Sequence, residues 1–263
     1  MSLVEERVLL TGATGGIGHA IARAFAARGA SLILTGRRID VLEPLAAEVG
    51  GRAIACDLSI REDVDRLSRA AAEMEVLVAN AALPASGPLT ELTQAQIDRM
   101  LEVNLRAPIA LARALAPAMI ERGRGHMVFI SSLAGKVASP ASSIYSATKF
   151  ALRGFALGIR EDLRPHGVGA SLVLPGFIRG AGMFADADVS LPIGVGTRSP
   201  EDVAAGVIRA IERNRAEVEI APAGLRLGAS FAGVAPQLAA AVSRRLGSEQ
   251  VAADLAAGQR DKR

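Results

Sequence analysis

The chain has 263 residues, of which 50% are hydrophobic and 22% charged, and this apolar fraction excludes an intrinsically disordered protein. The 30 basic residues are mixed with 27 acidic ones, giving a net charge of +3, and seven Phe, one Tyr and no Trp form no stacking platform, so we expect no nucleic-acid partner. The single cysteine, Cys56, excludes internal disulfides and favours a reducing compartment, so we expect a cytoplasmic location.

Neither the N-terminal residues nor the apolar runs of the sequence suggest membrane targeting. Residues 1–6 are too short and too acidic for a signal peptide. No charge-free apolar run reaches the 18 or so residues that a spanning helix needs, so we expect no stable membrane insertion. The three histidines are scattered, and we predict no metal site.

Short apolar runs alternate along the chain with longer segments of helical periodicity. Most of the runs are apolar throughout, as is typical of strands covered on both faces of a parallel sheet. Seven strands are predicted, at Arg7–Thr11, Ser31–Thr35, Arg52–Cys56, Val76–Asn80, Met127–Ser131, Val168–Leu174 and Glu217–Ala221. We therefore predict one α/β domain over 1–263, a doubly wound seven-stranded parallel sheet with helices on both faces.

Helix start signals support this alternation. Ser59 with Glu62, and Thr93 with Gln96, have capping-box spacing, and Pro200 follows Ser199 at a first helical position. The first helix is predicted over Ile17–Arg28, closed by Gly29. Two segments stand apart from the pattern: a Gly-rich stretch at 177–199, which we interpret as a substrate loop, and a C-terminal extension at 222–263 without a clear role.

The strongest motif joins the first strand to the first helix. Gly12 permits the tight turn, Gly16 lets the backbone approach a pyrophosphate, and Gly18 allows the helix to pack closely on the sheet. The free N–H groups at the helix start then attract phosphate. The segment predicts a dinucleotide site with these further contacts: Thr14, Gly15 and Ile17.

The spacing TGxxxGxG resembles the glycine motif of the short-chain dehydrogenase/reductase family, whose fold is Rossmann-like. Further matches follow in the family's order, from Arg7 to Ala221: Asp57-Leu58, Asn80-Ala81-Ala82, Asn104, Ser132, YxxxK at Tyr145 and Lys149, and Pro175-Gly176. The resemblance implies a nicotinamide cofactor bound by these segments and by the backbone of Ile178. It also implies an oxidoreductase acting on CH–OH groups, and a homodimer or homotetramer built on the helices Thr93–Arg122 and Ile144–Leu163.

The end of the second strand indicates which nicotinamide cofactor is preferred. It reads Gly36-Arg37-Arg38, with no carboxylate to bind a ribose 2′-hydroxyl. Guanidinium groups suit bidentate phosphate recognition, so NADP(H) is preferred over NAD(H), which stays possible. The family's other basic position, inside the glycine loop, is Gly15 here and supplies no charge.

Tyr145 and Lys149 are four residues apart and share one face of a predicted helix. A free phenol has a pKa of about 10, and a nearby ammonium group favours the phenolate. By resemblance, Lys149 also holds the ribose hydroxyls, Ser132 polarises the carbonyl, and Asn104 holds a water that relays protons from Lys149. These four residues are the predicted catalytic set.

The substrate is constrained only by its apolar surroundings. Ser132 and Tyr145 would meet the reacting group, with Leu83 and Phe177 lining the pocket. The leading interpretation is an NADP(H)-dependent oxidoreductase that interconverts a secondary alcohol and a ketone on a mainly apolar small molecule.

Three alternatives remain open. One is reduction of 3-oxoacyl groups on an acyl carrier protein, whose acidic surface would meet a set of arginines: Arg122, Arg124 and Arg164. Another is a catalytically silent NADP-binding interaction protein. The last is peripheral membrane attachment through Ala221–Leu246. The weak apolar content of this segment and its lack of Trp favour a packed lid or a subunit contact over membrane attachment.

Overall fold

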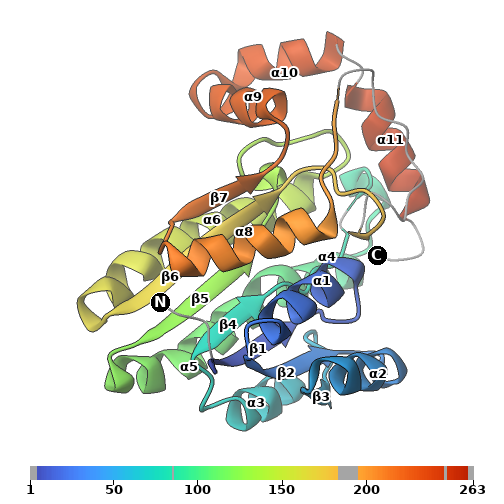
Figure 1. Ribbon diagram of the computed structural model, residues 1–263. Helices are drawn as coiled ribbons and strands as arrows, with labels where there is room; N and C mark the ends of the chain where they lie inside the picture. The colour runs from blue at the N-terminus through green and yellow to red at the C-terminus, as the bar shows by residue number, and fades with distance from the viewer. Residues whose placement is uncertain (1–4, 85, 183–194, 246–247, 260–263) are drawn as a thin grey trace.

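The computed structural model describes residues 5–84, 86–182, 195–245 and 248–259. Its centre is a seven-stranded parallel sheet in the order β3-β2-β1-β4-β5-β6-β7 (Figure 1). The strands are β1 Arg7–Thr11, β2 Ser31–Gly36, β3 Arg52–Ala55, β4 Val76–Ala79, β5 Gly125–Ile130, β6 Val168–Pro175 and β7 Glu217–Ile220. The strand order reverses between β1 and β4, which creates the crevice where doubly wound sheets bind their ligands.

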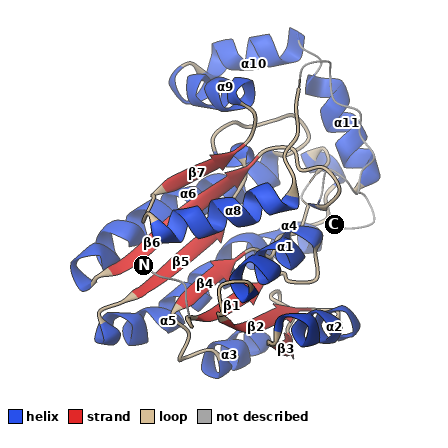
Figure 2. Cartoon of the chain, in the orientation of Figure 1, coloured by secondary structure: helices blue, strands red, loops and turns tan. Residues whose placement is uncertain are grey.

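Helices cover both faces of the sheet (Figure 2). The long ones are α1 Gly16–Ala26, α2 Ile39–Val49, α3 Arg61–Ala70, α4 Gln94–Leu101, α5 Ala107–Arg122, α6 Ser143–Leu163, α8 Pro200–Glu212, α9 Ala223–Val234, α10 Pro236–Arg245 and α11 Ser248–Gly258. A π-helical turn, Glu102–Arg106, links α4 to α5, and short 3₁₀ turns lie at Leu89–Glu91, Leu133–Gly135 and Arg164–His166.

The predicted fold class is confirmed. All seven predicted strands are present, and every strand pair is parallel. One apolar core lies between the sheet and α1, α2 and α8, and the other lies between the sheet and α3 to α6. The strands that are apolar throughout indicated this arrangement, because such strands must be covered on both faces.

Some of the predicted helix boundaries are confirmed and others are wrong. Thr93 and Ser199 cap their helices as expected, the latter with Asp202 at the third helical position. The capping box predicted at Ser59 is wrong: α3 begins after Ile60 without a side-chain cap, and Ser59 instead donates to Asp57. Helix α1 ends at Ala26, two residues earlier than predicted.

The run Gln94–Arg122 has the length and composition of a spanning helix, the only such run in the described residues. It contains the π-helical turn, and its α5 section buries one side in the fold, including Leu111, Leu115 and Met119. We therefore interpret it as a core helix of the α/β fold.

The C-terminal extension is helical. In Figure 1, α9 and α10 lie beyond the end of β7, and α11 runs from near α10 back toward α4. The hydroxyl of Ser86 donates to Gln259 Oε1 at 2.5 Å, and both residues are buried. The end of the extension therefore closes onto the segment that follows β4.

Candidate active site

The glycine loop follows β1 and lies directly against the end of β4. Gly12 has a φ of +65°, and a Cβ atom there would lie 2.6 Å from the Cα atom of Ala81. No other residue type fits both the conformation and the space. The close approach that the glycine pattern predicts is thus present.

A set of hydrogen bonds fixes the loop to β4. Thr11 Oγ1 accepts from the backbone N–H groups of Asn80 and Ala81, at 3.0 and 3.1 Å. The Asn80 side chain donates to the carbonyl oxygens of Thr11 and Gly12, at 3.1 and 3.0 Å. Asn80 is therefore a positioning residue for the loop, and its amide is already used.

The start of α1 is open to an anion. Gly15 and Gly16 are exposed, and no side chain caps the helix. The unpaired N–H groups of a first helical turn, with the positive end of the helix dipole, suit a pyrophosphate. Gly18 packs against Gly12 and Ala13, as the pattern predicts. The residues present therefore fit the diphosphate of a dinucleotide.

The two arginines after β2 have different surroundings. Arg38 donates to the carbonyl oxygen of Thr14 at 2.8 Å and so ties the glycine loop to the end of β2. Arg37 is exposed, and its charge acts on Asp57. Both arginines directly follow β2 at the carboxyl edge of the sheet, and Arg37 is the freer of the two.

Asp57 follows β3 at the carboxyl edge of the sheet. Burial acts to raise its pKa, but hydrogen bonds from Ser59 and the charges of Arg99 and Arg37 outweigh burial and hold the pKa below its usual value. One carboxylate oxygen accepts from Ser59 and the other pairs with Arg99 at 3.4 Å. The adjacent Leu58 is buried.

The structure brings Ser132, Tyr145 and Lys149 together at the carboxyl edge of the sheet. Ser132 caps the 3₁₀ turn after β5 and accepts from the backbone N–H of Ala134 at 3.1 Å. That turn lies directly on α6, because a Cβ atom at Gly135 would be 2.8 Å from the carbonyl oxygen of Lys149. Ser132 is close enough to Tyr145 for its hydroxyl to lower the pKa of that phenol, against the larger effect of burial.

Lys149 is 2% exposed, and its Nζ atom donates to the carbonyl oxygen of Ile130 at 3.0 Å. The same atom lies 5.5 Å from the centroid of the Tyr145 ring. An ammonium group has three donors, so the recorded bond leaves two for a ligand. A buried cation without an ion pair in the described part of the chain is well suited to hold the hydroxyl groups of a cofactor ribose.

Burial shifts both groups toward their neutral forms. Burial raises the pKa of Tyr145 to about 12, against a smaller lowering by the Ser132 hydroxyl. Burial lowers the pKa of Lys149 to about 8. Tyr145 is therefore a protonated phenol in the protein alone, and an added positive charge in the crevice would favour its phenolate.

Asn104 lies in the π-helical turn and is buried, but its side chain is used by the backbone of Leu83. Its Oδ1 atom accepts from the Leu83 N–H at 2.7 Å, and its Nδ2 atom donates to the Leu83 carbonyl at 3.0 Å. Nδ2 has one further contact, with Thr148 Oγ1 at 3.5 Å. This amide clamps the chain after β4, and its role in holding a water stays a prediction.

The substrate side is described in part. Pro175 ends β6 and Gly176 follows it. Ile178 is buried and pairs with Arg198 across the base of the loop. Phe177 is half-buried, whereas Leu83 belongs to the core between the sheet and α3 to α6. Residues 183–194 of the predicted substrate loop lie outside the described residues.

Sequence reasoning did not find two site residues. Ser131 donates to the carbonyl oxygen of Lys149 at 3.1 Å and so joins β5 to α6 behind the catalytic set. Gln259 meets Ser86 although 173 positions separate them. No local pattern signals either contact, because both depend on how distant elements pack.

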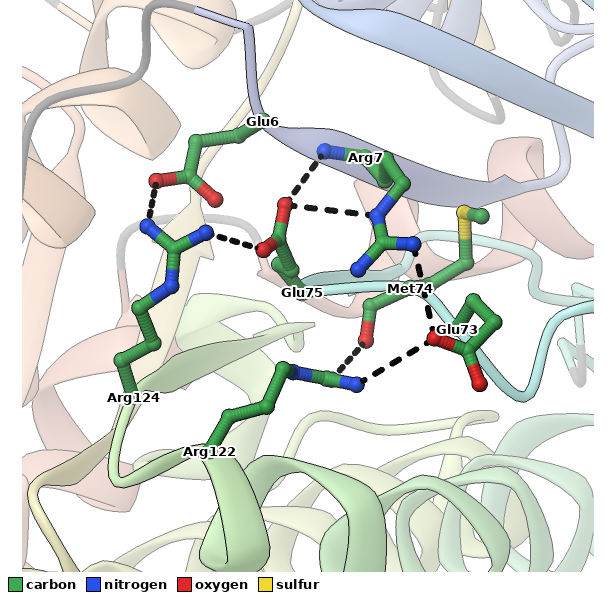
Figure 3. A network of polar contacts seen from close by, with 7 residues as sticks. All are labelled: Glu6, Arg7, Glu73, Met74, Glu75, Arg122 and Arg124. Carbon is green, nitrogen blue, oxygen red and sulfur yellow. Dashed lines mark hydrogen bonds and ion pairs between the residues drawn. The ribbon is translucent and has the colours of Figure 1, made fainter.

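A second polar cluster lies at the opposite, amino edge of the sheet (Figure 3). Arg124 pairs with the buried carboxylates of Glu6 and Glu75, and Arg122 pairs with Glu73. These residues lie at the starts of β1, β4 and β5, whereas the glycine loop, Asn80 and Ser132 follow the ends of the same strands. The cluster joins the starts of β1, β4 and β5 and is remote from the site.

Comparisons with known proteins agree with this geometry. The model of the short chain dehydrogenase family matches residues 6–189. Among curated proteins, the chain is 35% identical to the ketoacyl reductase HetN of Nostoc sp., over 82% of this chain and 79% of that protein. It is 33% identical to dehydrogenase/reductase SDR family member 7B of Xenopus laevis, over 81% and 73% of the two chains.

Solved structures show the same fold. A short-chain dehydrogenase from Sphingobium yanoikuyae in complex with NADPH has a TM-score of 0.76 and 28% identity, over 81% of this chain and 87% of that one. A metagenomic short-chain oxidoreductase in complex with NADP has a TM-score of 0.69 and 35% identity, over 84% and 98% of the two chains. A bulky-bulky ketone specific alcohol dehydrogenase from Comamonas testosteroni has a TM-score of 0.73 and 26% identity, over 81% and 85%.

Proposed function

Because the chain belongs to the short-chain dehydrogenase/reductase family, and is thus an oxidoreductase, we propose that it interconverts a secondary alcohol and a ketone on a mainly apolar small molecule with NADP(H). The observation that carries the proposal is the convergence of Ser132, Tyr145 and Lys149 beside an open glycine loop. The fold itself does not require a buried Lys149 next to the half-buried Ser132 and Tyr145.

The chain's own residues divide the work of ketone reduction. The start of α1 binds the diphosphate of the cofactor, and Lys149 holds the ribose hydroxyls. Bound NADPH supplies the hydride. The Ser132 hydroxyl orients the ketone, and the Tyr145 phenol donates the proton to its oxygen. In the reverse direction the positive charge of the oxidised nicotinamide and of Lys149 favours the Tyr145 phenolate, which accepts the alcohol proton.

Support for NADP(H) comes from the chain and from its relatives. Arg37 and Arg38 follow β2, where the sequence has no carboxylate for a ribose 2′-hydroxyl. Two structures of similar fold contain NADPH or NADP. The similarity to an alcohol dehydrogenase specific for bulky ketones agrees with an apolar ketone.

Tyr145→Phe tests the proposed chemistry. The variant keeps the buried ring and removes the proton donor, so kcat with a responsive ketone should fall at least about 10²-fold, the scale of general acid–base catalysis. Fluorescence titration should show NADPH binding unchanged. Ketone reduction at the wild-type rate by the variant would overturn the assignment.

A second candidate function is reduction of 3-oxoacyl groups on an acyl carrier protein, which the name of the Nostoc relative favours. The arginines expected to meet an acidic carrier do not support it. Arg122 and Arg124 belong to the cluster at the amino edge, and Arg164 pairs with Glu161. Comparing kcat/KM for a 3-oxoacyl group on the carrier protein and for the same group on a short thioester separates the two functions.

A further inference from the structure

The helices α9 and α10, which we call the outer helix pair, have an inverted distribution of apolar side chains. Their buried residues are alanines: Ala229 and Ala232 in α9, and Ala239 in α10. Five of their six large apolar residues face solvent, and Leu225 is half-buried. The exposed fractions of the five are: Leu227 72%, Phe231 46%, Val234 86%, Leu238 58% and Val242 48%. An amphipathic helix that packs only on its own fold would show the opposite arrangement.

This exposure is concentrated in one part of the molecule. Ten large apolar side chains are exposed in the described residues, and half of them lie in these two short helices. Leu227, Phe231 and Val234 are spaced four and three residues apart, so they share one face of α9. A contiguous apolar face of this kind marks an interaction surface.

The charges of the outer helix pair have one sign. The segment 222–245 contains three arginines and no Asp, Glu or Lys. Arg226 pairs with Glu219 of β7, whereas Arg244 and Arg245 at the end of α10 are exposed and form no ion pair within the described part of the chain. Positive charge next to exposed apolar side chains is complementary to an anionic lipid surface.

We propose that the outer helix pair docks on the surface of an anionic lipid membrane, with its apolar side chains in the headgroup–acyl boundary and Arg244 and Arg245 on lipid phosphates. The attachment is peripheral, because helices of 12 and 10 residues are too short to span a bilayer. The proposal is independent of the proposed reaction.

A second copy of this chain fits the surface less well. A two-fold contact through the outer helix pair would bring both copies of Arg244 and Arg245 to one interface. The pair has no acidic residue to neutralise them. An anionic membrane supplies that neutralisation.

The outer helix pair lies close to the edge of the sheet that carries the predicted active site. Helix α9 begins directly after β7, at the carboxyl edge of the sheet, where the catalytic groups also lie (Figure 1). Docking therefore brings this edge near the lipid.

Vesicle flotation with the full chain tests the proposal. The protein should float with vesicles of phosphatidylglycerol and phosphatidylcholine and stay at the bottom with phosphatidylcholine alone. The variant R244Q/R245Q should bind the anionic vesicles roughly 30-fold more weakly, since each basic residue near such a surface contributes about 1 kcal/mol. The variant L227S/V234S should lose at least about tenfold in binding.

The control is Ile60→Ser, which removes an exposed apolar side chain elsewhere on the molecule and should float like the wild type. Thermal unfolding of each variant shows that its fold is retained. Absence of wild-type flotation, or equal flotation of all variants, would overturn the proposal. So would light scattering in which L227S/V234S changes only the oligomeric state, which would identify the surface as a contact between copies of this chain.

Discussion

A Cβ atom on Gly16 would lie 2.5 Å from the Cβ atom of Ala181, so the segment after β6 rests on the glycine loop. This contact joins the phosphate-binding turn to the base of the predicted substrate loop. It brings the side chain of Ala181 against the turn that we expect to bind the pyrophosphate.

Gly16→Ala should therefore impair cofactor binding more than folding. The added methyl group meets Ala181 and narrows the approach to the start of α1, so the Kd for NADPH should rise at least about tenfold, the effect of roughly 1.4 kcal/mol. The matched control is Gly15→Ala, since the nearest atom to a Cβ there is 3.9 Å away. Equal Kd values for the two variants would contradict this role of Gly16.

Lys149→Met should stabilise the protein while abolishing its activity. The lowered pKa of Lys149, about 8 against an ordinary 10.5, means that below pH 8 the fold bears the full cost of a buried charge. That cost is about 3 kcal/mol at 1.36 kcal/mol per pKa unit, and loss of the hydrogen bond to Ile130 offsets about 1 kcal/mol. At pH 7 the free energy of unfolding should rise by about 1–2 kcal/mol.

The pH dependence of that difference checks its cause. Between pH 8 and 10.5 the folded protein has released the Lys149 proton and the unfolded chain still holds it, so wild-type stability rises with pH. The Met variant lacks this rise, and its advantage should disappear over the same range. Urea unfolding at pH 7 and pH 10 measures both quantities. A constant difference would show that the Lys149 charge is not the cause.

The fold could be predicted, as could the proximity of the proposed catalytic residues, because the signals for both are local. Seven short and mostly apolar runs identify a doubly wound sheet, and the spacing of Tyr145 and Lys149 survives folding because one helix carries both. The clamp of Asn104 on Leu83 could not be predicted, since it depends on a π-helical turn. The false capping box at Ser59 shows the limit of motif spacing: the nearby Asp57 competes for its hydroxyl.

His126 should account for part of the acid sensitivity of the fold. Burial and the charge of Arg160 lower its pKa to about 3, and its Nε2 atom is 2.8 Å from Ser171 Oγ. The ring is held neutral in the fold, whereas the unfolded chain binds a proton near pH 6.5. Stability is therefore lost as pH falls from about 6.5 to 3, by at most about 1.4 kcal/mol per pH unit from this group.

His126→Gln removes the titrating group and should flatten that slope, although it lowers stability at neutral pH by disturbing a tightly packed ring. Chemical unfolding at half-unit steps from pH 4 to 7 gives the slope directly. His166→Gln is the matched control because His166 is exposed. An unchanged slope in the His126 variant would assign the acid sensitivity to other groups.

Cofactor preference is the prediction in which two adjacent residues should behave differently. Arg37 is exposed directly after β2, and a ribose 2′-phosphate bound there would gain a charge-assisted bond from it. Such a bond contributes about 1.5–3 kcal/mol, which is a 10- to 150-fold effect. Arg37→Ala should therefore raise the Kd for NADPH by at least about tenfold and leave the Kd for NADH unchanged. Arg38 instead holds the glycine loop through the Thr14 carbonyl, and that loop binds the diphosphate common to both cofactors. Arg38→Ala should weaken both. Titration of each cofactor against the wild type and the two variants separates these roles, and a wild-type affinity for NADH equal to or better than that for NADPH would make Arg37 an ordinary surface residue.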